Sequence, residues 1–423
     1  MGTLTVGVLA DDLTGATDTV VQFREAGWPA YLLLSGDLPD GVLAQADAVA
    51  LARSLDTRAL NHDDASRVTQ QAARQQLDSG TQRLYLKIDS TMRGSIAGQV
   101  RGALQAWSRQ HPAAIAVLCP AYPPMGRTVR DGRVYVNGVP LHDSPAGHDP
   151  VTPVATSTLT DLVPGAAHVE QADGPGVLAR RLREAAPDGG IVTVDAANEQ
   201  DLRRLAEAAE IVGESAVWAG SAGLARHLAE VWRPGTSFVT APDPTPTGEG
   251  RVVVCVSSLN AVSLDQARHL ENSFSSELVG LEVAAADLSD TTRLHELVSP
   301  VAARDVRVVL VQPDPRRASG GDRTDAARIV ARGLAKAIAQ ILDAGGTTGL
   351  VLVGGDGAEA TLRLLGAQAL EMRSQPSEGV PLTRVVGGSA DGLAVVTKAG
   401  GFGTTSTITD VVSAMLGHKE GST

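Results

Sequence analysis

The segment Val6-Gly7-Val8-Leu9-Ala10-Asp11-Asp12-Leu13-Thr14-Gly15 decides the fold, because an apolar run stops at two adjacent carboxylates and a Thr/Gly corner follows. Such a break is typical of a buried parallel strand that delivers polar groups to the carboxyl edge of a sheet, where open α/β folds bind their ligands. We expect Thr14 to cap a helix that ends near Gly27-Trp28-Pro29. The segment therefore predicts one half of an active site.

Apolar strands continue to alternate with helical segments along the chain. Strands are predicted at residues 30–34, 46–52, 83–88, 115–118, 191–194 and 216–219, and a second series at 251–256, 277–283, 306–311, 349–353 and 393–397. This βαβ pattern predicts the α/β class, with two domains that each contain a largely parallel, doubly wound sheet. A Pro-rich segment divides the two series, so we expect domains at 1–233 and 251–423 joined by a semi-rigid linker at 234–250.

The composition limits the classes of partner. A net charge of −12 argues against nucleic acid or an anionic membrane surface, since both attract a basic face. Cys119 and Cys255 lack C-x-x-C spacing, so we expect neither a disulfide framework nor a zinc site, and a reducing compartment. Without a signal-peptide pattern or an apolar run of membrane-spanning length, the sequence predicts a cytoplasmic protein, and it permits a monomer or a homodimer.

Two long segments interrupt the βαβ pattern. Between Cys119 and Ser157 the chain is rich in Pro and Gly, and its Asp131-Gly132 and Asn137-Gly138 pairs predict turns around a short ribbon. Loops of this length inside a compact domain are usually functional or disordered, and the regular turn signals favour function. Residues 312–323 are expected to form an exposed loop.

The first candidate site is the Asp11-Asp12 pair at the end of the opening strand. Paired carboxylates can bind sugar hydroxyls, hold a divalent ion or accept a proton from an attacking alcohol. The alternative is that one caps a helix and the other is solvated. The apolar strand before the pair and the glycine after it favour function.

The second candidate site follows another predicted strand. Lys87 and Asp89 are two residues apart and therefore share one face of a strand end. Ser90, Arg93 and Gly94 then offer a hydroxyl, a guanidinium and backbone N–H groups, and a guanidinium can bind a carboxylate in bidentate fashion. The alternative is a surface Lys–Asp pair followed by an ordinary helix cap.

Three polar or glycine-rich turns end strands of the second series. They are Ser257-Ser258, Gly354-Gly355-Asp356-Gly357 and Gly400-Gly401. Backbone N–H groups at such helix starts attract phosphate, although the G-x-x-x-x-G-K-[ST] pattern is absent from the sequence. Gly355-x-Gly357-x-x-Ala360 with Glu371 weakly imitates a dinucleotide fingerprint, which supports an NAD-dependent dehydrogenase as an alternative. A turn made only for close helix packing is the other alternative.

Together these motifs resemble the four-carbon acid sugar kinases, which act on tetronates such as threonate, erythronate and 3-oxo-tetronate. The resemblance rests on segments that occur in the family's order: Ala10–Asp18, Lys87–Gly94, Cys119–Pro123 with Gly126-Arg127-Thr128, Asp149–Val154, Ala219–Ala225, Gly354–Gly357 and Lys398–Gly403. Leu259 and Ala261 stand where the family often has small or hydroxyl residues, and Gly357 stands where it usually has Thr. All three departures lie on the nucleotide side, and the altered Ser257–Ala261 turn keeps a non-catalytic sensor of sugar acid and nucleotide as a further alternative.

The resemblance implies that residues 1–233 bind the sugar acid, that residues 251–423 bind ATP, and that the active site lies in the cleft between the two domains. Phosphate would pass from ATP, with Mg²⁺, to a terminal hydroxyl of the acid sugar. No metal-binding residue is assigned, and the sequence does not specify which tetronate or which stereochemistry is preferred. Asp12 and Asp356 rank close together as the general base. The expected substrate-binding residues are Asp11, Asp12, Lys87, Asp89, Ser90, Arg93, Gly94 and Arg127, and the expected nucleotide-binding residues are Ser257, Ser258, Gly354, Gly355, Asp356, Gly357, Gly400 and Gly401.

Overall fold

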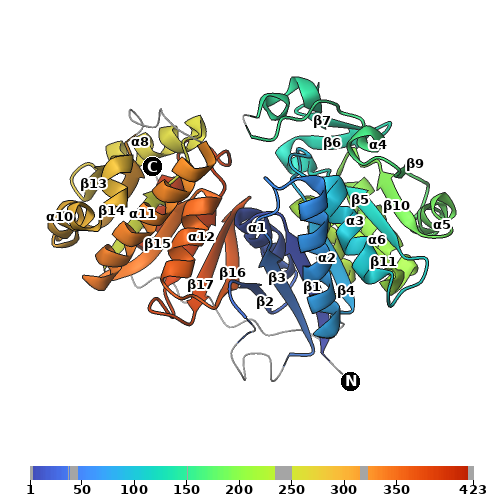
Figure 1. The fold of residues 1–423 in the computed structure, drawn as a ribbon, viewed down its shortest axis with the longest axis horizontal. Helices are drawn as coiled ribbons and strands as arrows, with labels where there is room; N and C mark the ends of the chain where they lie inside the picture. Colours follow the sequence, from blue (N-terminus) through green and yellow to red (C-terminus); the bar gives the residue numbers. More distant parts are fainter. Residues whose placement is uncertain are drawn as a thin grey trace. The chain divides into compact units, whose positions relative to one another are not determined.

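The computed structural model describes residues 3–36, 38, 46–149, 151–233, 250–314 and 323–417. They belong to two compact units: residues 1–32 with 39–239 form unit 1, and residues 33–38 with 240–423 form unit 2. Each unit is a mixed α/β structure (Figure 1). The predicted linker lies outside the described residues except for Gly250, as does most of the loop predicted at 312–323. The cleft between the domains stays a prediction.

The sheet of unit 1 has the strand order β2-β3-β1-β4-β11-β5-β10-β9. Its strands are β1 (Leu4–Ala10), β2 (Ala30–Leu33), β3 (Ala48–Ser54), β4 (Arg83–Lys87), β5 (Ile115–Cys119), β9 (Ala167–Val169), β10 (Gly190–Val194) and β11 (Ala216–Gly220). All pairs from β3 to β9 are parallel. Helices cover both faces of such a sheet, so its central strands are continuously apolar; Val6, Val8 and Leu9 are fully buried. The predicted parallel, doubly wound sheet is confirmed.

The helices of unit 1 pack in two groups. One group, α1 (Leu13–Glu25), α5 (Pro175–Ala185), α6 (Glu199–Val212) and α7 (Ala222–Val231), forms a packed series, and the other is the pair α2 (His62–Asp78) and α3 (Ile96–Trp107). A short helix, α4 (Leu159–Leu162), follows the ribbon segment. Gly98 and Gly102 of α3 allow close approach to α2, because a Cβ atom at either would overlap the carbonyl of His62 or Ser66.

The strand register places the functional motifs of unit 1 at one edge of its sheet. Ala10 of β1 pairs with Ser54 of β3 and with Lys87 of β4, and Lys87 pairs with Gly220 of β11. The chain leaves β1 for β2 on one side of it in the sheet and leaves β4 for β5 on the other side. The neighbouring strands β1 and β4 therefore flank a topological switch point. Open α/β sheets bind their ligands at such a point.

The Pro/Gly-rich segment of unit 1 folds into a separate small sheet, β6-β7-β8. Its strands are β6 (Arg127–Arg130), β7 (Arg133–Val136) and β8 (Val139–Pro140). Both connecting turns have positive φ at both central residues: 51° and 68° at Asp131-Gly132, and 50° and 82° at Asn137-Gly138. This is the requirement of type I′ hairpin turns, and the predicted turns are confirmed.

The sheet of unit 2 has the strand order β13-β14-β12-β15-β18-β17-β16. Its strands are β12 (Arg251–Val256), β13 (Leu278–Val283), β14 (Val308–Pro313), β15 (Thr347–Val353), β16 (Ala369–Ser377), β17 (Val380–Val386) and β18 (Ala394–Lys398). The five strands predicted from the sequence are all present and run parallel. The hairpin β16–β17 was not predicted; it runs antiparallel at the end of the sheet.

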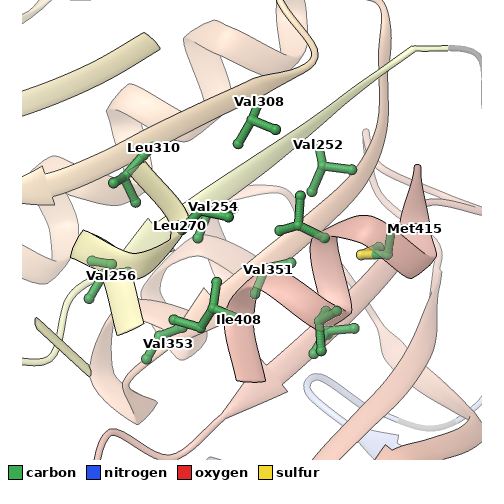
Figure 2. Close-up of a cluster of buried hydrophobic side chains, with 14 of the residues drawn as sticks. Val252, Val254, Val256, Leu270, Val308, Leu310, Val351, Val353, Ile408 and Met415 are labelled. Atoms are coloured by element: carbon green, nitrogen blue, oxygen red, sulfur yellow. The ribbon is translucent and has the colours of Figure 1, made fainter. Parts of the chain in front are cut away.

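The core of unit 2 is a cluster of buried hydrophobic side chains on one face of its sheet (Figure 2). Alternate residues of β12, β14 and β15 point to the same face and pack against helices α8 (Ala261–Ser273) and α13 (Thr407–Met415). The labelled contributors are Val252, Val254, Val256, Val308, Leu310, Val351, Val353, Leu270, Ile408 and Met415.

The remaining helices of unit 2 are α9 (Ala285–Ser289), α10 (Thr291–Ala302), α11 (Arg323–Asp343) and α12 (Gly355–Leu364). No helix among the described residues of either unit combines the length and the apolar composition needed to cross a bilayer.

Candidate active site

Asp12, not Thr14, is the N-cap of α1. Its backbone is extended, and its Oδ1 accepts a hydrogen bond from the N–H of Gly15 at 2.7 Å. The prediction for Thr14 is wrong, because Thr14 lies in the first turn and its hydroxyl donates to Asp12 Oδ2 at 3.0 Å. A carboxylate is a strong acceptor for the free N–H groups at the positive end of a helix. The cap fixes the Asp12 side chain beside the switch point.

Arg58 joins the carboxylates of this site and was not predicted from the sequence. Its Nε donates to Asp11 Oδ2 at 2.7 Å, its Nη1 lies 2.8 Å from Asp12 Oδ2, and its Nη2 lies 3.8 Å from Asp89 Oδ1. The sequence carries only part of the signal: Arg58 follows the end of β3 by four residues, whereas the pairing of β3 with β1 is known from the structure. A cation so close to the end of that strand lies at the same edge as Asp11-Asp12.

Gly94 makes room for Arg58. A Cβ atom on Gly94 would lie 2.7 Å from the carbonyl oxygen and 3.2 Å from the Cα of Arg58, and the φ of Gly94 is +88°. Both the approach and the backbone conformation require glycine. The structure thus gives Gly94 a packing role, and its predicted contact with substrate stays a prediction.

Asp89 and Arg93 are paired with each other. Arg93 donates from Nε to Asp89 Oδ2 at 2.9 Å and from Nη2 to Asp89 Oδ1 at 3.0 Å, and its Nη1 donates to Asp149 Oδ2 at 3.0 Å. Thr91 also donates its hydroxyl to Asp89. The guanidinium predicted to clamp the substrate carboxylate is therefore bound by two carboxylates of the protein. Asp149 is 56 residues away in the sequence, so this pairing depends on the tertiary fold.

Lys87 is the cation of this edge that has no partner within the described chain. It is 5% exposed, and none of the described residues forms a hydrogen bond or ion pair with its ammonium. A Cβ atom on Gly15 would lie 2.8 Å from Lys87 Nζ, so the glycine leaves space for this group. Asp11 and Asp12 lie close enough to interact electrostatically with Lys87, but no described residue accepts a hydrogen bond from its ammonium, which has three donors. We therefore expect the Lys87 ammonium to bind a ligand.

Arg127 and Ser90 complete the predicted residues of unit 1. Arg127 donates from Nη1 to the carbonyl of Met125, while its Nε is buried without a partner among the described residues. Burial lowers the pKa of Arg127, and Asp89 and Arg93 both act on it electrostatically, which places it near their pair. Ser90 is half-buried in the turn after β4.

The carboxylates of the site differ in their electrostatics. Burial raises the pKa of Asp11. Burial also acts to raise the pKa of Asp12, but Arg58 and Lys87 outweigh it and the net pKa is lowered. Asp12 is therefore ionised at neutral pH and can accept a hydrogen bond from a sugar hydroxyl.

The Asp89–Arg93 pair predicts a loss of stability in acid. Burial would raise the pKa of Asp89, but Arg93 and Arg58 hold it well below its ordinary value of 3.8. The folded state thus binds a proton less readily than the unfolded state, so this stabilisation is complete above about pH 4 and disappears as the pH falls through the lower folded pKa. Asp89→Asn should flatten the fall in unfolding free energy between about pH 4 and 2.

All four tryptophans, Trp28, Trp107, Trp218 and Trp232, belong to unit 1, so their fluorescence in urea titrations follows that unit. Asp64→Asn is the matched control, because Asp64 pairs with Arg67 at the surface. An equal acid dependence in Asp89→Asn and the natural protein would contradict the prediction.

In unit 2 the predicted nucleotide-binding residues come together at one edge. Val256, Val353 and Lys398 are in register across β12, β15 and β18, so the turns that follow these strands are neighbours. A Cβ atom on Gly354 or Gly357 would overlap the Ser257 hydroxyl, and one on Gly400 would overlap the Ser258 side chain. The glycines therefore allow the three turns to approach closely.

The N-terminus of α12 offers free backbone donors. Gly354 caps the helix without a side-chain hydrogen bond, and Ala358 makes the first hydrogen bond back to Gly354. The N–H groups of Gly355, Asp356 and Gly357 have no acceptor in the described part of the chain. The Asp356 side chain is exposed in this first turn. Free N–H groups at a helix start favour an anion.

A cavity of about 520 Å³ in unit 2 lies away from these turns. Its lining includes Thr347 at the start of β15 and Ala394 at the start of β18, which is the amino edge of the sheet. Ligands of open α/β sheets bind at the carboxyl edge, so this cavity does not replace the glycine turns as the candidate site.

Two protein families match this chain, one in each of its two units. Residues 6–228 match the family described as "Sugar-binding N-terminal domain", and residues 253–408 match that described as "Nucleotide-binding C-terminal domain". A D-threonate kinase from Bordetella bronchiseptica is 38% identical over 411 residues, covering 95% of this chain and 95% of that protein. A 3-oxo-tetronate kinase from Brucella melitensis is 27% identical, covering 94% of this chain and 93% of that protein.

A solved structure shares the fold. A protein from Haemophilus influenzae superposes with a TM-score of 0.72 at 23% identity, covering 97% of this chain and 99% of that one. The two matched families cover the two units, and 38% identity extends over 95% of the chain. The chain therefore belongs to the family of four-carbon acid sugar kinases.

Proposed function

We propose that this protein transfers phosphate from ATP to the terminal hydroxyl of a tetronate or a 3-oxo-tetronate. One observation carries the proposal: the 38% identity to a D-threonate kinase spans both the polar edge of unit 1 and the glycine turns of unit 2. Phosphoryl transfer needs little covalent chemistry from the protein; it needs in-line placement, neutralised charge and an acceptor for the alcohol proton. The residues at the two edges supply groups for each of these tasks.

The sugar acid would bind at the switch point of unit 1. Lys87 would bind its carboxylate, because its ammonium lies beside Asp12 and no described residue accepts its hydrogen bonds, and Arg127 would add its unpaired Nε. Asp12 and Ser90 would bind hydroxyls. Arg93 holds Asp89 in place, so its role on the substrate is one of positioning.

Asp12 is the better general base of the two candidates. A carboxylate has about four lone-pair sites, and the Asp12 oxygens accept from Gly15, Thr14 and Arg58. One site on Oδ1 remains for a sugar hydroxyl, and this carboxylate belongs to the unit that matches a sugar-binding family. Asp356 belongs to the nucleotide-binding unit, where a carboxylate at a helix start opposes a phosphate unless a cation lies between them.

Asp356 fits a role in holding Mg²⁺. No group of three or more His, Cys, Asp or Glu side chains suited to a metal ion occurs in the described part of either unit. Mg²⁺ does not require one, because it keeps several waters and takes one or two carboxylates together with substrate phosphates. Bound there with ATP, Mg²⁺ would neutralise charge on the phosphates. The protein's own contribution is the exposed Asp356 carboxylate beside the free N–H groups of α12.

The proposal is tested by incubating the protein with ATP, Mg²⁺ and a panel of tetronates, namely both enantiomers of threonate and erythronate and their 3-oxo forms, and measuring ADP. We expect ADP release that depends on one or a few of these acids. Absence of ADP while calorimetry shows binding of both ligands would favour the sensor. Reduction of NAD by a sugar acid would favour the dehydrogenase.

Asp356→Asn is predicted to raise the KM for ATP about tenfold and to increase the Mg²⁺ concentration needed for half-maximal rate, because one of few ligands for the ion is weakened. The Kd of the sugar acid, measured by calorimetry, should change less than about twofold. Glu359→Gln is the matched control, since Glu359 lies one turn further along α12 and pairs with Arg363 at 2.8 Å. An unchanged Mg²⁺ dependence in Asp356→Asn would refute the assignment.

A further inference from the structure

Three buried side chains bind the carbonyl groups of the turn that follows β18. Lys398 Nζ donates to the carbonyl of Ala399 at 2.8 Å and lies 3.4 Å from that of Gly400, and Ser263 donates to the Gly400 carbonyl at 2.6 Å. Gln266 donates from Nε2 to the carbonyls of Phe402 and Thr404 at 3.0 and 2.6 Å. Ser263 and Gln266 are fully buried, and Lys398 is 1% exposed.

These hydrogen bonds determine the direction of the backbone N–H groups. In a trans peptide the C=O of one residue and the N–H of the next point in opposite directions. The carbonyls of Ala399, Gly400 and Phe402 are bound by side chains of α8 and β18, so the N–H groups of Gly400, Gly401 and Gly403 point away from those donors. None of these three N–H groups has an acceptor in the described residues of unit 2.

Lys398 also brings an uncompensated charge to the turn. No carboxylate of the described residues lies within ion-pair distance of its ammonium, and burial lowers its pKa to about 8. A buried cation that is hydrogen-bonded only to carbonyls costs less once an anion binds nearby. The free N–H groups of α12 lie on the neighbouring turn, because the Gly354 N–H donates to the Lys398 carbonyl at 2.9 Å.

We propose that Lys398, Ser263 and Gln266 are positioning residues, which hold the Gly400-Gly401 turn with its N–H groups directed at the nucleotide phosphates. This inference rests on the proposed function and adds residues to it. Lys398 orients the backbone through the carbonyls and supplies positive charge behind it. Ser263 and Gln266 supply orientation alone.

Arg251 offers a matched structural control. It is also a buried cation of unit 2 bonded to carbonyls, donating to Ala302 at 2.8 Å and Ile341 at 3.2 Å. Arg251 is the first residue of β12 and Lys398 is the last residue of β18. Because these strands run parallel, Arg251 lies at the amino edge of the sheet and Lys398 at the carboxyl edge. Loss of Arg251 hydrogen bonds should reduce stability without altering nucleotide binding.

The test is calorimetry with ADP on the full chain, together with thermal unfolding without nucleotide. We expect Lys398→Met to weaken ADP binding about 30-fold and Ser263→Ala about fivefold, with Lys398→Arg recovering part of the loss. Arg251→Lys should lower the melting temperature and leave the Kd for ADP within about twofold. Sugar-acid binding should be unchanged in all four variants.

Two outcomes separate this inference from the function on which it rests. If Lys398→Met and Ser263→Ala both bind ADP within about twofold of the natural protein, the inference is overturned and the proposed function stands. If the natural protein binds no ADP, both are overturned. Should Lys398→Met fail to fold, Ser263→Ala decides the question alone, because it removes one hydroxyl and leaves the charge in place.

Discussion

Asp12→Asn should lower kcat for tetronate phosphorylation about 10³-fold, within the range of 10² to 10⁴ that general acid–base groups contribute. Asparagine is as good an N-cap as aspartate, so the bond from the Gly15 N–H and the start of α1 are preserved. The amide cannot take the proton of the attacking hydroxyl. The loss should therefore appear in kcat at saturating sugar acid and ATP, while calorimetry shows sugar-acid affinity reduced only a few-fold.

A pH profile of the natural protein gives a second measurement on the same residue. Arg58 and Lys87 lower the pKa of Asp12 despite its burial, so Asp12 remains ionised above its ordinary value of 3.8. No loss of rate from protonation of Asp12 is expected between about pH 5 and 8. Thr14→Val is the control, because it removes one hydroxyl that donates to Asp12 and leaves the carboxylate. Retention of kcat in Asp12→Asn with a large loss in Asp356→Asn would reverse the assignment of the base.

Local patterns in the sequence predicted the places where strands end in polar or glycine-rich turns. Asp11-Asp12, Lys87–Arg93 and Gly354–Gly357 all lie at carboxyl edges, because an apolar strand followed by a helix start fixes that geometry within a few residues. The sequence predicts Thr14 and not Asp12 as the cap, because both residue types are good caps and the exact first residue of a helix is not determined by residue type alone.

Contacts between distant segments could not be predicted in the same way. Arg58 became a site residue only when the register set β3 beside β1, and Arg93 proved to be bound by Asp149 from a loop 56 residues away. The hairpin β16–β17 has polar residues on its strands and weak apolar periodicity, so its pairing was not evident. Register and long-range pairing are tertiary properties, whereas caps and turns are local.

Arg58→Met should both destabilise unit 1 and remove activity. Arg58 bonds Asp11 and Asp12, so its loss leaves these two carboxylates without their main cation, and it also approaches Asp89. Removing one partner of a buried ion pair costs about 3–5 kcal/mol. Tryptophan fluorescence in urea should show this loss in unit 1. We expect kcat/KM for the tetronate to fall by about 10³ in folded protein, because Asp12 loses the Arg58 contact to Oδ2 that helps to fix its carboxylate.

Arg58→Lys separates charge from geometry. A lysine keeps the positive charge but cannot bond two carboxylates with the fixed fork of a guanidinium. Arg58→Lys should recover roughly half of the unfolding free energy that Arg58→Met loses. It should recover little of kcat/KM, because the orientation of the Asp12 carboxylate depends on the planar guanidinium. Arg67→Met is the surface control; Arg67 is 73% exposed in its pair with Asp64, and such pairs contribute about 0–1 kcal/mol. Full activity in Arg58→Lys would mean that charge alone organises the carboxylates, and equal stability of Arg58→Met and Arg67→Met would remove Arg58 from the centre of the site.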